Sequence, residues 1–133
     1  FVIGISILHH LDIEKVGREL KRVVKNGGKA VFLEPLGESE FLNFIRTNIL
    51  NIHFGKIKDK TNEHPLSYID ISTLGNYFSN TEYKEFQFLG MISRIFGDAF
   101  SEKFSLNKID EKLLKNFPSF KKYCRLVVVI YSK

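Results

Sequence analysis

The first 33 residues constrain the fold more than any other part of the sequence. An apolar run rich in Ile, FVIGISIL at 1–8, is followed by a charged stretch, a glycine pair and a second apolar run, KAVFL at 29–33. Nearly continuous apolar runs of this length are typical of strands that are buried on both faces of a parallel sheet. The pattern predicts two parallel strands, 2–8 and 29–33, joined by a right-handed crossover.

The stretch between the two runs has the features of an amphipathic helix. Asp12 is placed to cap its N-terminus, and Glu14 adds negative charge to its first turn. Apolar residues recur at helical spacing, namely Ile13, Val16, Leu20, Val23 and Val24. The sequence NGG at 26–28 then supplies a left-handed stop.

The rest of the chain predicts further helices and one more pair of strands. Helical patterns occur at 39–52, 67–78, 91–104 and 107–116. Ser67 and Asp70 have the spacing of a capping box at the start of the second of these. The runs at 82–89 and 124–132 predict an antiparallel pair at one edge of the sheet. We therefore expect an α/β fold in a single domain over 1–133: a partial Rossmann-like sheet, two parallel strands plus an antiparallel edge pair, with flanking helices.

Composition narrows the classes of function. The net charge is +5, but the basic residues are scattered in runs of at most two, which favours solvated faces over a nucleic-acid surface. The single cysteine, Cys124, excludes an internal disulfide and a thiolate zinc cluster, and its apolar neighbours predict a buried thiol. No signal-peptide pattern is present, and no run approaches the roughly 20 apolar residues of a membrane helix. A cytoplasmic protein that binds no membrane is expected.

The stretch SILHHLDIEKVGRELKRVVKNGGKAVFLEPLG at 6–37 resembles the second half of class I S-adenosylmethionine-dependent methyltransferases (type 11-like). In that family a strand ends near Leu-His-His, a helix follows, and a Pro-Gly-Gly turn leads into the fifth strand. Asn26 stands where the family usually has Pro. The segment EHPLSYIDISTLGNYF at 63–78 is similar to one that passes near the substrate in members acting on small molecules.

Features that hold the cofactor in this family are absent from the sequence. The family uses a Gly-rich loop after its first strand and an acidic residue at the end of its second. No GxGxG occurs here, and residue 1 maps inside the family's fourth strand. The first three strands, on the order of 100 residues, have no counterpart. The resemblance thus implies the C-terminal portion of a methyltransferase domain, which by itself binds the cofactor weakly or not at all.

The resemblance also implies a cofactor segment. In the family, the backbone equivalent to Ser6, Ile7 and Leu8 lies along S-adenosylmethionine, and the first histidine, His9, often faces the site. The alternative is that one of the two adjacent histidines caps the following helix while the other packs on the sheet. Adjacent histidines diverge, and no nearby acidic or thiolate partner completes a ligand set with them, so no metal site is expected.

Three further residues are candidates on the substrate side. His64 is the candidate general base, because its loop approaches the substrate in the family and His titrates near neutrality. A histidine that fixes the loop is the alternative. Glu34 and Arg46 are candidates for binding a small-molecule methyl acceptor. The alternatives are that Glu34 solvates the rim of the site and that Arg46 is a surface residue.

Two functions remain open at this point. The first is methyl transfer from S-adenosylmethionine to a small molecule by the intact parent protein, with this portion inactive alone. The second is a non-catalytic interaction module that retains part of a methyltransferase fold. Without the first three strands, the apolar strand 2–8 would have an unpaired edge, and such an edge pairs readily with another chain. Self-association through this edge, or through the exposed face of the sheet, is expected.

Overall fold

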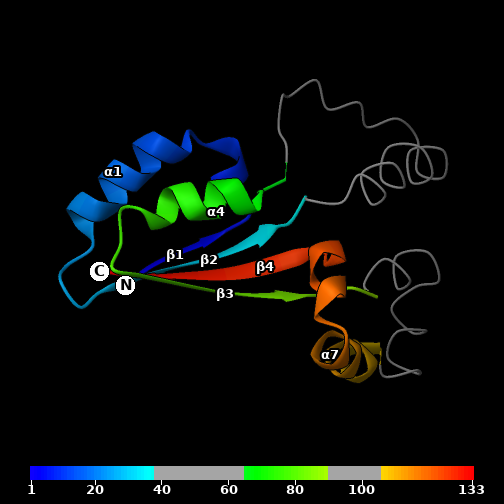
Figure 1. The fold of residues 1–133 in the computed structure, drawn as a ribbon. Coiled ribbons are helices and arrows are strands. Elements are labelled where there is room, and N and C mark those ends of the chain that lie inside the picture. Colours follow the sequence, from blue (N-terminus) through cyan, green and yellow to red (C-terminus); the bar gives the residue numbers. More distant parts are fainter. Residues whose placement is uncertain (38–64, 90–105) are drawn as a thin grey trace, which may run out of the picture.

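A computed structural model of the chain describes residues 1–37, 65–89 and 106–133. Four strands in these residues form one sheet: β1 (Val2–Ile5), β2 (Lys29–Pro35), β3 (Asn80–Phe86) and β4 (Leu126–Ser132). Their order is β1-β2-β4-β3, and Figure 1 shows them side by side. β1 and β2 are parallel, and β4 is antiparallel to both β2 and β3. The predicted α/β class, the parallel pair and the antiparallel pair are confirmed.

Helices cover one face of this sheet. The helices α1 (Ile13–Val23) and α4 (Tyr68–Gly75) pack against each other over it, whereas α7 (Leu106–Asn116) lies beyond the ends of β3 and β4 (Figure 1). Two short 3₁₀ helices, η1 (Leu8–His10) and η3 (Pro118–Tyr123), precede α1 and β4. The helices predicted over 39–52 and 91–104 lie outside the described residues.

The predicted helix starts are confirmed. The Asp12 side chain accepts a hydrogen bond from the Lys15 N–H at 3.1 Å and so caps α1. Ser67 and Asp70 form a reciprocal capping box at α4, with each side chain accepting from the other residue's backbone N–H. After α1, Gly27 takes the left-handed conformation, with a φ of 74°. The caps at Asp12 and Ser67 therefore fix where α1 and α4 begin.

The core lies between α1, α4 and one face of the sheet. Alternate strand residues point into it, which gives β4 its regular alternation of buried and partly exposed positions. The buried cluster includes Leu20, Val24, Ala30, Phe32, Leu66, Ile71, Leu74, Val127, Val129 and Tyr131. The hydroxyl of Tyr131 donates to the carbonyl of Ile71 at 3.3 Å, so the largest buried side chain is also satisfied.

The opposite face of the sheet is open at β1. Ile3 is 75% exposed and Ile5 is 67% exposed, although both are large apolar side chains. They stand opposite Val31 and Leu33 of β2, which face the same way. The prediction that this strand is buried on both faces is therefore wrong for one face. Among the described residues, β1 also pairs with β2 alone, which leaves its other edge free.

The strand ends differ from those predicted. β1 ends at Ile5 rather than at residue 8, and β3 runs over Asn80–Phe86 rather than 82–89. In both cases the next residue is left-handed, Ser6 with a φ of 50° and Gln87 with a φ of 62°, and an extended strand cannot continue through that conformation. β2 continues to Pro35, past the predicted 33, because it pairs along its whole length with β4.

Candidate functional site

A buried carboxylate organises the exit of β1. Glu34 lies near the end of β2 on the core face and is fully buried. Its Oε1 accepts hydrogen bonds from the N–H groups of Ile7 at 2.8 Å and Leu8 at 2.9 Å. The left-handed turn at Ser6 directs these two successive N–H groups toward one acceptor, in the arrangement of an anion-binding nest. Here the anion is a side chain of the neighbouring strand.

The same carboxylate orients His9. Its Oε2 lies 2.8 Å from Nδ1 of His9, whose side chain is 13% exposed. Because a carboxylate accepts hydrogen bonds, Nδ1 carries the proton, and in the neutral ring the lone pair is then on Nε2. The ring of His10 lies beside that of His9, with 3.9 Å between their centroids. The result is a carboxylate–histidine pair with a defined tautomer.

His9 lines a hollow of about 310 Å³ that opens between η1 and the starts of α1 and α4. Its other walls include the apolar Leu8, Leu66 and Ile13, together with the carboxyl groups at the two helix starts, which are those of Asp12, Glu14 and Asp70. The hollow is at the small end of the size range of ligand sites. It lies where β1 and β2 end, and in open α/β sheets ligands bind at the carboxyl ends of the parallel strands.

The segment predicted to lie along the cofactor has no free backbone donor. The Ser6 N–H donates to the carbonyl of Leu33 at 2.8 Å, and those of Ile7 and Leu8 donate to Glu34. Ile7 is 44% exposed, so it offers apolar surface against which a flat ring can pack. These three residues therefore offer a ligand apolar contact rather than backbone donors, and the polar groups beside the hollow are the carboxyls of Asp12, Glu14 and Asp70.

The structure brings together five of the seven predicted site residues. Ser6, Ile7, Leu8, His9 and Glu34 form one hydrogen-bonded cluster. Glu34, however, is inside the molecule rather than at the rim, so it acts on a ligand only through His9. The other two predicted residues, Arg46 and His64, lie outside the described residues.

A second buried carboxylate, which the sequence did not indicate, has the same role at the exit of β3. Asp110 of α7 is 6% exposed and accepts from the N–H groups of Phe88 and Leu89, both at 2.8 Å. Burial raises the pKa of Asp110, and the hydrogen bonds from Leu89 and Phe88 oppose that rise. In sequence, Asp110 looks like one more solvated acid on a charged helix. The residue before Phe88, Gln87, has a left-handed backbone, whereas the sequence placed it inside the strand predicted at 82–89.

No protein-family model, no curated protein and no solved structure matches this chain. Among the described residues, no helix has both the length and the apolar character that a membrane span requires. Within the same residues, no group of three or more His, Cys, Asp or Glu side chains is arranged to hold a metal ion. Proposals about function therefore depend on the geometry and on the resemblance.

Proposed function

We propose that the intact parent protein transfers a methyl group from S-adenosylmethionine to a small molecule, and that His9 is its proton acceptor. The observation that carries this proposal is the hydrogen bond from His9 Nδ1 to the buried Glu34. It leaves the Nε2 lone pair as the basic atom, beside a hollow at the end of the parallel strands. The observed strand pairing agrees with what the resemblance implies.

The chain's own residues would act on the methyl acceptor. The cofactor supplies an electrophilic methyl group when it is bound. A hydroxyl or amine acceptor attacks more readily if its proton is removed, and Nε2 of His9 takes that proton. Glu34 holds the ring in the required tautomer and stabilises the imidazolium that forms, as the buried carboxylate does in catalytic triads. Ile7 and Leu8 fix Glu34 in turn through their N–H groups.

The test uses the protein encoded by the complete reading frame. Labelled S-adenosylmethionine is supplied with a panel of small phenols, amines and carboxylic acids, and the transfer of label is measured. We expect transfer to at least one class of acceptor, a loss of about 10²-fold or more in His9→Gln, and little change in His10→Gln. Equal rates in wild type and His9→Gln would remove the role of His9. Absence of transfer to every class would contradict the proposal as a whole.

The open face and free edge of β1 favour a second candidate function. Exposed, uncharged apolar strands at a sheet edge are unusual in chains that remain alone, because they pair with other strands. A non-catalytic module that completes its sheet with another chain would use this surface directly. The two candidates differ in their dependence on His9: pairing through β1 is unchanged by His9→Gln, whereas methyl transfer is lost.

A further inference from the structure

A second hollow, larger than the one beside His9, lies at the exit of β3. It holds about 880 Å³, within the range of sites for small molecules, and opens between β3, α7 and η3. Phe86, Leu114 and Pro118 supply apolar walls. The polar lining comes from Gln87, from three lysines and from two glutamates.

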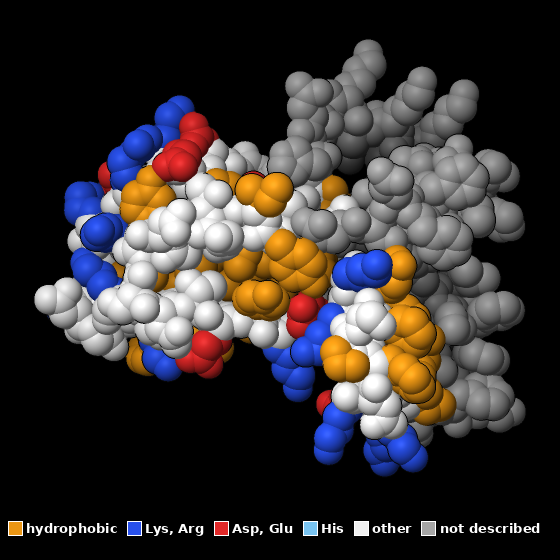
Figure 2. Space-filling model, in the orientation of Figure 1, with side chains coloured by type: hydrophobic (Ala, Val, Ile, Leu, Met, Phe, Trp, Pro, Cys, Tyr) orange, Lys and Arg blue, Asp and Glu red, His pale blue; other side chains and the backbone are white. Residues whose placement is uncertain are grey.

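The charged groups of this hollow favour an anion. Its lysines are Lys84, Lys115 and Lys121, against the acids Glu85 and Glu111. Glu85 is already engaged: it is 7% exposed, its Oε1 accepts from the hydroxyl of Tyr68 at 3.0 Å, and its Oε2 lies 4.0 Å from Nζ of Lys121. Neither Lys84 nor Lys115 forms an ion pair with any residue that the structure describes. Figure 2 shows basic side chains over α7 and at the adjacent end of the sheet.

Gln87 adds an unsatisfied acceptor to the same hollow. Its Oε1 is buried and has no hydrogen-bond partner among the described residues. A buried polar atom left unpaired costs about 1–3 kcal/mol, so proteins rarely retain one without a use. The backbone around Gln87 is held firmly, because its carbonyl accepts from the Arg125 N–H at 3.3 Å and Asp110 binds the next two N–H groups. A bound N–H or O–H donor would satisfy Oε1.

We propose that this hollow binds a small organic anion: an apolar skeleton that bears one carboxylate or phosphate and one hydrogen-bond donor. Lys84 and Lys115 hold the anionic group, the walls formed by Phe86 and Leu114 pack on the skeleton, and Oε1 of Gln87 accepts from the donor. The anionic group would pair with lysines that form no ion pair with a described residue, and the donor would bond an acceptor that has no partner among those residues.

This site is separate from the one proposed for methyl transfer. β1 and β3 are at opposite edges of the sheet, three strand spacings apart, which is about 14 Å. A small molecule in one hollow therefore does not contact His9 and fill the other hollow at the same time. Anion binding at the β3 exit can be measured without a cofactor, and its outcome is independent of methyl transfer.

The test is an amide-resolved NMR titration of the chain with 4-hydroxybenzoate and, separately, with 4-hydroxyphenyl phosphate, which carries the same ring hydroxyl. The neutral 4-hydroxybenzamide is the comparison ligand. We expect shifts confined to the neighbourhood of 84–87 and 111–121, and binding at least tenfold weaker for the neutral amide. The stronger of the two anions shows whether the hollow is adapted to carboxylates or to phosphates.

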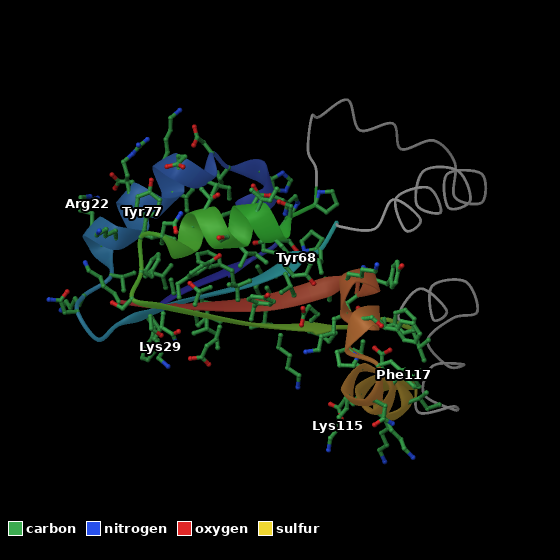
Figure 3. All side chains as sticks on the ribbon, viewed as in Figure 1. Arg22, Lys29, Tyr68, Tyr77, Lys115 and Phe117 are labelled. Carbon is green, nitrogen blue, oxygen red and sulfur yellow. The ribbon has the colours of Figure 1, made fainter. Side chains whose placement is uncertain are left out.

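Two sets of variants make the assignment specific. Lys84→Gln combined with Lys115→Gln should weaken anion binding at least tenfold, whereas Lys29→Gln, at the opposite end of the sheet from Lys115 (Figure 3), should not. Wild type should bind 4-hydroxybenzoate more tightly than benzoate, which lacks the donor for Oε1 of Gln87, and Gln87→Leu should remove that preference. Equal loss in Lys29→Gln, shifts centred elsewhere, or tight binding of the neutral amide would each overturn the proposal.

Discussion

Two buried acids, Glu34 and Asp110, each bind the backbone of the turn that follows a strand. Each accepts two successive backbone N–H groups that follow a left-handed residue, Ser6 in one case and Gln87 in the other. Hydrogen bonds to a charged acceptor are about twice as strong as those between neutral groups. Each turn is therefore held by one side chain that is distant in sequence. The polar atoms assigned to ligands lie at or just after these turns: Nε2 of His9 and Oε1 of Gln87.

The first prediction concerns the stability that Glu34 provides. Glu34→Gln keeps the shape of the side chain, but its amide cannot accept hydrogen bonds at both ends. The amide oxygen can still accept from the N–H groups of Ile7 and Leu8, but the amide NH2 then faces His9 Nδ1, which has to take the other tautomer. Loss of the charge on the acceptor weakens all three hydrogen bonds, which should lower the free energy of unfolding by about 1–2 kcal/mol. Urea denaturation measures this change. Glu19→Gln, on the exposed surface of α1, is the matched control and should leave the midpoint nearly unchanged.

The second prediction concerns the thiol of Cys124, which is 1% exposed, so the predicted buried cysteine is confirmed. Burial, together with the nearby carboxylates of Asp110 and Glu85, raises its pKa to about 12. Because the thiolate is the reactive form, the native protein should react very slowly with a disulfide reagent at pH 8. Unfolding in urea should restore full reactivity. Rapid labelling of the native chain would show that this part of the fold opens easily.

At the scale of elements, the sequence predicted those helix and strand ends that depend on contacts between residues close together in the chain. The starts of α1 and α4 were predictable because their caps lie within three residues of the groups that they satisfy. The ends of β1 and β3 were not, because the carboxylates that bind the turns come from 26 and 22 residues away. The same reasoning holds for the site: the segment at Ser6–His9 was predicted by resemblance, but the contacts that hold the buried Glu34 side chain come from residues 25 to 27 positions earlier.

The third prediction tests the capping box of α4. Ser67→Ala removes the acceptor for the Asp70 N–H and should lower the free energy of unfolding by about 1 kcal/mol. Ser72→Ala, at an exposed position within the same helix, is the control and should have little effect. Both can be measured by thermal unfolding followed by circular dichroism. A loss as large in Ser72→Ala would mean that the cap is not the cause.

At the scale of the whole molecule, the helices that the structure describes cover only one of the two faces of the sheet. α1 and α4 bury one face, whereas Ile3 and Ile5 leave apolar surface on the other, next to the free edge of β1. Exposed edges of this kind usually carry charges or prolines that prevent pairing, and β1 has neither. The expected consequence is association with another copy through this surface.

The fourth prediction is that the chain self-associates at micromolar concentration and that charge on β1 prevents it. Ile3→Lys and Ile5→Lys should each give a monomer in sedimentation velocity, because lysine on both copies introduces repulsion at the interface. Ile69→Lys, which changes an equally exposed isoleucine on α4, should still self-associate. A stable wild-type monomer across the micromolar range would exclude pairing through β1.

The order of the strands also has a consequence for synthesis. β4 comes after β3 in the chain but lies between β2 and β3, so it supplies both neighbours with their hydrogen bonds. While the ribosome is still making residues 126–132, β3 has no strand to pair with and Glu34 lacks its neighbour Val127. Until β4 has been made, β3 and one edge of β2 therefore stay unpaired, and their backbone groups are accessible to chaperones or to the strands of other chains.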